Sequence, residues 1–412
     1  MIEQAPLPPL RRIDAALRAA TAVLARELLD PTSRSPAWDE FEWAIAKAVA
    51  IMQGIAPLLA SQSRWPDRPR WQEFLGEQRR HVSTRQERIE VLLAGIDAIA
   101  RPQGVPLVPL KGAALHMLGI YVHGDRPMAD IDLFAPAEAK VAAGKVLSDC
   151  GFEVTFENWR HQLFELRNSA HRSVEFGEHA DNPIKIELHT TIRERLPVAE
   201  TDITGLIAPL VPKPGLNGYR SPVYLMMHLL LHAASNMRAR ALRMIQLHDI
   251  ARLSSRFTSD DWEELLAARP SGRSLWWGAP PLLLAVRDCG AVVPVSILGA
   301  FEKDCPLPLR RITSKQSLAD ISWSNIQVHA FPGVEWSRTP VEAMRFMLRR
   351  LWPNAETRAE LRHFAEHEQG KSTISWYGVS QRRRIWRWVF SRPPRVQTLR
   401  VVQAALEQTA WR

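Results

Sequence analysis

The chain has 412 residues, of which 46% are hydrophobic and 24% charged, and its formal net charge is +9. These fractions are typical of a globular protein and exclude a disordered chain, while the length favours two or three domains over one. Most of the positive charge is arginine, whose planar guanidinium suits phosphate or carboxylate ligands. An anionic ligand is therefore one interpretation, and an arginine-rich genome explains the excess equally well.

The cysteines and the hydropathy of the chain bear on its compartment. Cys150, Cys289 and Cys305 have no paired spacing, which indicates neither a disulfide framework nor a zinc site. The N-terminal segment lacks a continuous apolar core, and no apolar stretch approaches the length of a membrane span. We therefore expect no signal peptide and no transmembrane segment, in a soluble protein of the cytoplasm.

Periodicity divides the chain into an α+β core between helical regions. Apolar residues recur at intervals of three and four over residues 1–100, which predicts an N-terminal helical region. In residues 101–210 apolar and polar residues alternate in several short segments. Strands are therefore expected at 105–110, 129–135, 152–157, 161–167, 172–177 and 184–191. Helices are expected at 112–120 and 136–151. A helical cover region at 211–305 and a Trp- and Arg-rich, mainly helical region at 306–412 follow.

The central chemistry lies around a D-x-D strand. Asp130 and Asp132 are two apart in an otherwise apolar strand and therefore project from the same face. Such close carboxylates repel each other unless a cation neutralises them, and Mg²⁺ (or Mn²⁺) is the natural choice. Lys111 and Gly112 stand where a strand turns into a helix, a place where backbone N–H groups and a lysine receive phosphate. Together these features point to phosphoryl or nucleotidyl transfer.

A third acid is expected at Glu187, which lies alone among apolar residues of another strand. It could share the metal and accept a proton from an attacking hydroxyl. Taken by itself, Glu187 alternates with Lys185 and His189, and this pattern describes a solvated strand face equally well. A D-x-D pair is also common on surface strands, so the order of the segments is more specific than any one of them.

That order resembles the DNA-polymerase-beta type of nucleotidyltransferase. More narrowly, it resembles an uncharacterised bacterial nucleotidyltransferase family with an L-K-G-x-x-L, then Y, then R-x-x-x-D-I-D-L pattern. The matching residues are Leu110, Lys111, Gly112, Leu115, Tyr121, Arg126, Asp130, Ile131, Asp132 and Leu133. Where the family carries its third acid in D-L-H, this chain has Glu187-Leu188-His189, and its turn reads K-G-A rather than G-S or G-G.

The resemblance implies a small mixed sheet of five strands with helices, a divalent metal, and an NTP such as ATP as donor. It implies Asp130, Asp132 and Glu187 as catalytic metal ligands, and it adds Arg126 to Lys111 and Gly112 as a phosphate contact. His189, Asp249 and Arg243 are possible supporting residues.

Two further positions have a structural and a functional interpretation. Asp249 lies on the apolar stripe of its helix, and a structural ion pair is expected with Arg238, Arg240 or Arg243. His228 and His232 are four residues apart on a very apolar helix, which is the spacing of a zinc pair. Buried, hydrogen-bonded core histidines are the better expectation there.

Residues 382–390, RRRIWRWVF, interleave arginine with aromatics, as nucleic-acid grooves and membrane-surface helices do. A helix whose tryptophans pack on the protein while its arginines stay in water fits equally.

Three functions follow from the sequence. The first is a metal-dependent nucleotidyltransferase that moves an NMP from an NTP to a hydroxyl or phosphate of a small molecule, peptide or protein. The second is the same core acting on RNA, in the manner of nucleotide-adding toxins. The third is a non-catalytic nucleotide-binding scaffold.

Overall fold

The computed structural model describes residues 7–62, 65–167, 176–268, 274–353, 355, 358, 381–391 and 393–410. Its N-terminal helices are α1 (Leu10–Leu29), α2 (Glu40–Met52), α3 (Ala56–Gln62) and α4 (Pro69–Ala100). The central part contains β1 (Pro106–Pro109), α5 (Lys111–Met117), β2 (Asp130–Phe134), α6 (Lys140–Asp149), β3 (Phe152–Glu157), β4 (His161–Leu166), β5 (Lys185–His189), β6 (Arg193–Arg195), β7 (Glu200–Asp202), α7 (Thr204–Ile207) and β8 (Gly215–Leu216). The later helices are α8 (Pro222–Arg238), α9 (Met244–Ser254), α10 (Ser259–Ala267), α11 (Ala279–Cys289), α12 (Val295–Lys303), α13 (Leu307–Thr313), α14 (Leu318–Ile321), α15 (Pro340–Leu351), α17 (Gln381–Phe390) and α18 (Val396–Ala410).

The sheet has six strands in the order β3-β4-β5-β2-β1-β8. The pairs β2–β5 and β1–β8 are parallel and the other pairs are antiparallel. This mixed sheet with its flanking helices confirms the predicted α+β class. The sixth strand is β8, whose two residues are too few to leave a period in the sequence. The β6–β7 hairpin was also missed, because its charged residues show no apolar alternation. Most of the strand expected at 172–177 lies outside the described residues.

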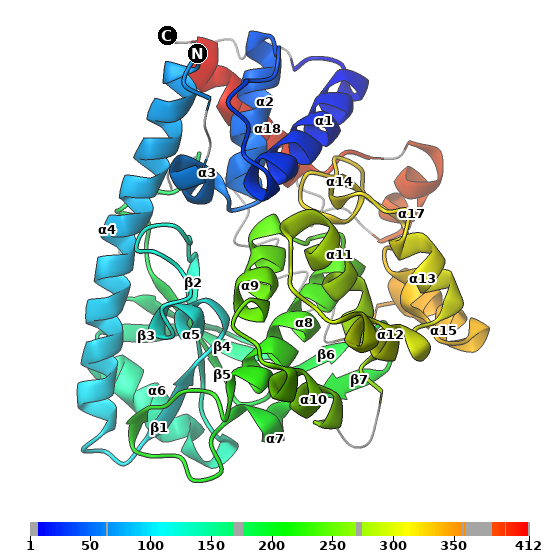
Figure 1. The fold of residues 1–412 in the computed structure, drawn as a ribbon. Coiled ribbons are helices and arrows are strands. Elements are labelled where there is room, and N and C mark those ends of the chain that lie inside the picture. The colour runs from blue at the N-terminus through cyan, green and yellow to red at the C-terminus, as the bar shows by residue number, and fades with distance from the viewer. Residues whose placement is uncertain are drawn as a thin grey trace.

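Two layers of apolar packing enclose the sheet. On one face, α6 and the C-terminal half of α4 pack against buried residues of β2 and β5, among them Ile131, Leu133 and Ile186. The other face adjoins a larger core that the N-terminal helices share with α5 and α8 to α11. Helix α4, which is 32 residues long, contributes buried residues to both cores and runs along one side of the molecule (Figure 1). The sheet face with the acids is therefore the one turned toward α5 and α8.

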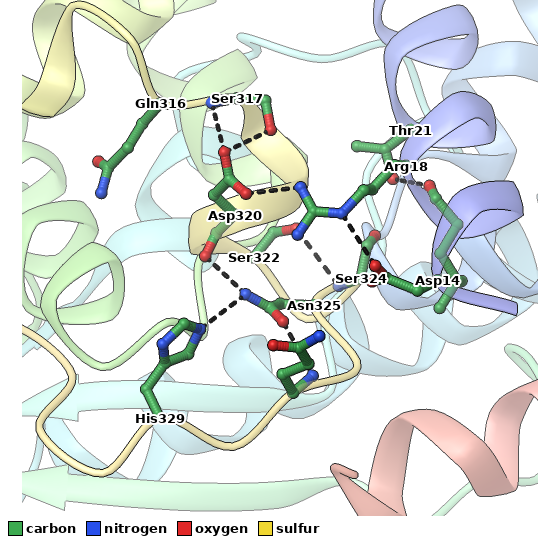
Figure 2. Close-up of polar contacts among 12 residues, drawn as sticks. Asp14, Arg18, Thr21, Gln316, Ser317, Asp320, Ser322, Ser324, Asn325 and His329 are labelled. Atoms are coloured by element: carbon green, nitrogen blue, oxygen red, sulfur yellow. Dashed lines mark hydrogen bonds and ion pairs between the residues drawn. The ribbon is translucent and has the colours of Figure 1, made fainter. Parts of the chain in front are cut away.

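The C-terminal segment is attached to the N-terminal helices by polar contacts (Figure 2). The Arg18 guanidinium on α1 lies 2.6 Å from Asp320 Oδ1 and 3.3 Å from Asp14 Oδ2. Gln53, directly after α2, donates hydrogen bonds to the hydroxyls of Ser322 and Ser324. The last helix, α18, packs against α2 (Figure 1). The first and last parts of the described chain thus form one body, and the region boundaries expected from the sequence stay a prediction.

Two expectations about the whole chain can be compared with the structure. Cys150, Cys289 and Cys305 are all free thiols, as expected. Among the described residues, no single helix has the length and apolar character needed to cross a membrane. Within the described parts of the chain, α2 and α3 meet that test only when taken together, and they are bent by 110° where they join.

His248 on α9 makes the stability of the fold depend on pH. The residue is only 5% exposed, and its Nε2 has no hydrogen-bond partner among the described residues. Burial lowers the pKa of His248 to about 4. Between pH 6.5 and 4 the unfolded chain therefore binds a proton that the folded chain does not, so stability falls as the pH falls.

We predict that His248→Gln makes the unfolding free energy less dependent on pH. The decrease in unfolding free energy from pH 7 to pH 5 should be about 2 kcal/mol smaller in the variant than in the parent, because glutamine does not titrate. Urea unfolding at the two pH values measures this loss, and His123→Gln, at an exposed histidine, is the control. An unchanged pH dependence in His248→Gln would show that the imidazole is solvated.

Candidate functional site

The register of three adjacent strands gathers the candidate residues on one face of the sheet. In the parallel pair β2–β5, Asp132 lies opposite Glu187. In the antiparallel pair β4–β5, His161 lies opposite His189. Asp130 projects from the same face, because it is two residues from Asp132. Each residue thus has a neighbour across the strands, and the site is built on rigid backbone.

The polar atoms of this face are close together. His189 Nε2 lies 3.0 Å from Asp132 Oδ1 and 3.4 Å from Glu187 Oε2, and His161 Nδ1 lies 3.6 Å from the same Glu187 oxygen. The side chains of His161, Glu187 and His189 are 16%, 22% and 11% exposed. The acid expected from the sequence is therefore beside the D-x-D strand, with two imidazoles around it.

Lys111 neutralises part of the negative charge of these acids. Its Nζ lies 2.7 Å from Asp132 Oδ1. Burial disfavours the charged amine, but the three nearby acids outweigh burial and raise the pKa of Lys111. Its backbone is left-handed, with φ of 45°, a conformation that costs a non-glycine residue energy and often marks a functional position. The lysine predicted as a phosphate contact therefore binds a carboxylate of the site.

The backbone of Lys111 is held from the helical layer. Its N–H donates to the hydroxyl of Tyr219 over 3.2 Å, and that hydroxyl lies 2.8 Å from Nδ1 of the buried His228 on α8. Neither Tyr219 nor His228 was predicted to support the site. Nε2 of His232 is bonded to the side-chain amides of Asn236 and Gln246. Both histidines are thus hydrogen-bonded as expected, and they are not part of the possible metal-ligand group found in the described chain.

The two acids of the D-x-D strand have opposite pKa shifts. Burial and the repulsion of Asp132 and Glu187 raise the pKa of Asp130 to about 6. Burial acts in the same direction on Asp132, but Lys111 and His189 overcome it and lower the pKa of Asp132. One carboxylate is thus compensated, while burial and the neighbouring acids outweigh the effect of Lys111 and Arg243 on the other. The oxygen donors of Asp130, Asp132 and Glu187 suit Mg²⁺ or Mn²⁺, and the uncompensated charge favours a divalent cation there.

Gly112 and Arg126 do not form an open phosphate cradle. The Arg126 guanidinium lies so close to Gly112 that a β-carbon at this position would collide with it. Asp249 Oδ1 and Oδ2 accept bonds of 2.7 Å from Arg126 Nε and Nη2, and Tyr121 donates a third bond of 2.8 Å to Asp249. Glycine is therefore needed here to admit the guanidinium, and Arg126 is held by a buried carboxylate.

The ion pair of Asp249 was expected, but its partner was predicted wrongly. Instead of reaching Asp249, Arg243 donates to the carbonyls of Ile51 and Met52 at the end of α2, and Arg240 pairs with Glu335. These arginines lie in and beside the turn from α8 to α9, which directs them toward other helices. The residue that reaches Asp249 comes from the loop before β2, a long-range contact that helical periodicity does not encode.

Arg85 is a further supporting residue that was not predicted from the sequence. It lies on α4 and is 3% exposed. Its guanidinium donates to the carbonyls of Met128 and Ala129, directly before β2, and to those of Asn182 and Pro183, before β5. One side chain thus fixes the starts of the two strands that carry the acids.

The sequence held a signal for Arg85 but none for His161. Arg85 occupies a position of the apolar stripe Val82–Arg85–Ile89 of α4, where a charged residue must find buried partners. His161 is the first residue of β4, and only the register with β5 reveals that it faces His189.

The aromatic and arginine-rich segment forms α17. Trp386 and Phe390 stack with ring centroids 4.8 Å apart and are 65% and 71% exposed, while the Arg350 guanidinium lies over the ring of Trp388. The side chains of Arg382 and Arg384 lie outside the described residues. A role in nucleic-acid binding stays a prediction.

We predict that Asp249→Asn destabilises the fold by about 3 kcal/mol, because it leaves the Arg126 guanidinium buried without its counter-charge. Urea unfolding measures this loss, and Arg126→Met in the same background should recover part of it. Glu157→Gln, which removes an exposed ion pair with Lys140, is the matched control and should change little. Full stability of Asp249→Asn would mean that the pair is solvated.

The comparisons with known proteins agree with the site. No curated protein and no solved structure matches the chain. The sequence profile described as "Uncharacterised nucleotidyltransferase" matches residues 39–272, which is more than half of the chain and includes α4, α9 and every strand of the site. The resemblance seen in the sequence is confirmed, and the chain belongs to this uncharacterised nucleotidyltransferase family.

Proposed function

We propose that the protein transfers an NMP from an NTP to a hydroxyl or phosphate of a small molecule, peptide or protein, with Mg²⁺ or Mn²⁺ as cofactor. The observation that carries the proposal is the grouping of Asp130, Asp132 and Glu187 on two adjacent parallel strands, with Lys111 against them. The proposed compartment is the cytoplasm, where the unpaired cysteines would stay reduced.

Asp130, Asp132 and Glu187 would hold the metal. When bound, a divalent cation in such a site neutralises charge on the phosphates and orients the attacking and leaving oxygens. Of the three acids, Asp130 alone has a raised pKa, so its charge is the least compensated of the three. Lys111 keeps Asp132 ionised and adds a positive charge near the triphosphate. Glu187, bonded to His189, is the candidate to accept the proton of the acceptor hydroxyl.

NTP binding tests the first part of this proposal. We predict that calorimetric titration of each NTP shows binding with Mg²⁺ and none with EDTA, and that Asp130→Asn/Asp132→Asn abolishes it. The amides cannot replace the negative charge that attracts the metal. Glu153→Gln, at an exposed carboxylate on β3 of the same sheet, is the control and should bind as the parent does. Equal binding in EDTA would contradict a metal-bound nucleotide.

Turnover tests the transfer itself. We predict that Asp132→Asn lowers the rate at least a hundredfold, about 3 kcal/mol of barrier, and that Glu187→Gln costs a similar amount. Pyrophosphate release measures the rate, and circular dichroism checks that both variants fold. A Glu187→Gln variant with the parent rate would remove this acid from the site.

The acceptor is identified by where the label from an α-³²P-labelled NTP is found after incubation with a cell extract. Label in small molecules or proteins supports the proposed function. Salt-sensitive label in RNA supports the toxin-like alternative. Metal-dependent NTP binding with no label in any fraction supports the non-catalytic scaffold.

A further inference from the structure

Beside the pair Asp130 and Asp132, the sheet carries a group of different chemistry. His161, Glu187 and His189 offer two imidazole nitrogens and a carboxylate oxygen that all lie within 4.8 Å of one another. Imidazole ligands suit zinc, cobalt, nickel and iron, whereas magnesium prefers oxygen alone. We propose that these three residues bind a divalent transition-metal ion, with Zn²⁺ as the prototype, at a position that adjoins the acidic site and shares Glu187 with it.

The spacing of the donor atoms fits such an ion. Around a tetrahedral ion with bonds of about 2.0–2.2 Å, ligand atoms lie roughly 3.3–3.6 Å apart. His189 Nε2 and Glu187 Oε2 are 3.4 Å apart, and His161 Nδ1 and Glu187 Oε2 are 3.6 Å apart. Asp132 Oδ1, 3.0 Å from His189 Nε2, is a further oxygen donor beside the group. The two imidazole nitrogens lie within 4.8 Å of each other, so side-chain movements that draw them together let the three donors surround a cation.

The backbone holds these donors in place. Glu187 and His189 are on β5, and His161 begins β4, the neighbouring strand, directly opposite His189. The start of β4 is fixed by Asn158, whose side-chain oxygen accepts hydrogen bonds from the N–H groups of Arg160 and His161. A site on paired strands is more precise than one on loops, and this favours binding by a small ion.

This inference deepens the proposed function. Binding of the ion does not require that function, and only the effect of the ion on nucleotidyl transfer rests on it. Glu187 belongs to both groups, so a transition-metal ion bound there would lie next to the nucleotide site. The protein would then respond to Zn²⁺ or Co²⁺ differently from Mg²⁺. Binding of the ion itself needs no nucleotide and can be measured without turnover.

The test uses Co²⁺ as a coloured probe for the tag-free, chelator-treated full chain. We expect one equivalent of Co²⁺ to give the visible absorption bands of a low-coordinate ion. Zn²⁺ should bleach these bands, and excess Mg²⁺ should leave them. His161→Gln and His189→Gln should each lower the Co²⁺ affinity about a hundredfold, because each removes one ligand. The control His123→Gln, at an exposed histidine away from the group, should bind as the parent does.

Two results would overturn the proposal. One is the absence of the bands in the parent protein, and the other is unchanged Co²⁺ affinity in His161→Gln with its fold verified by circular dichroism. In either case the histidines serve only as hydrogen-bond partners of the acids. Mg²⁺-dependent NTP binding, measured separately, distinguishes the two proposals. NTP binding without cobalt bands refutes this inference alone, and cobalt bands without NTP binding refute the nucleotide proposal alone.

Discussion

The repulsion among three carboxylates on one sheet face is the constraint on which the site depends. Asp130, Asp132 and Glu187 come together because β2 and β5 are parallel neighbours with Asp132 opposite Glu187. Burying like charges is costly unless positive groups compensate them. Lys111 and His189 compensate Asp132, while Asp130 keeps a raised pKa of about 6. This arrangement favours a cation beside the acids, and the metal-dependent transfer that we propose requires one.

Much of the helical structure serves to hold that face in place. Tyr219 and His228 fix the strained backbone of Lys111, and Arg85 binds the carbonyls before both acidic strands. The Arg126–Asp249 pair, closed by Tyr121, joins the loop before β2 to α9. These contacts come from α4, α8, α9 and the segment before α8. The site is thus a product of the helical layers as much as of the sheet, and the family match over residues 39–272 includes these helices as well as the strands.

The same contacts give Lys111-Gly112 a different role from the phosphate contact that its sequence predicts. In the sequence, Lys111-Gly112 resembles a phosphate-binding turn at the start of a helix. In the structure, α5 has only seven residues, Gly112 makes room for Arg126, and Lys111 binds Asp132. The lysine is therefore the internal counter-ion of the acids. The nucleotide binding that we propose would exchange this cation for a metal ion at the carboxylates.

The sequence by itself determined the five longer strands, the helices around them and the acids. The period-two pattern located β1 to β5, and the isolated acids in apolar strands marked Asp130, Asp132 and Glu187, because a charge in such a strand needs a partner. The tertiary structure decided which side chains contact one another. His161 faces His189 only through strand register, Arg126 found Asp249 from more than a hundred residues away, and Arg85 reached four carbonyls of two loops. Local periodicity records which side of an element is buried, but it carries no information about which distant residue lies across from it.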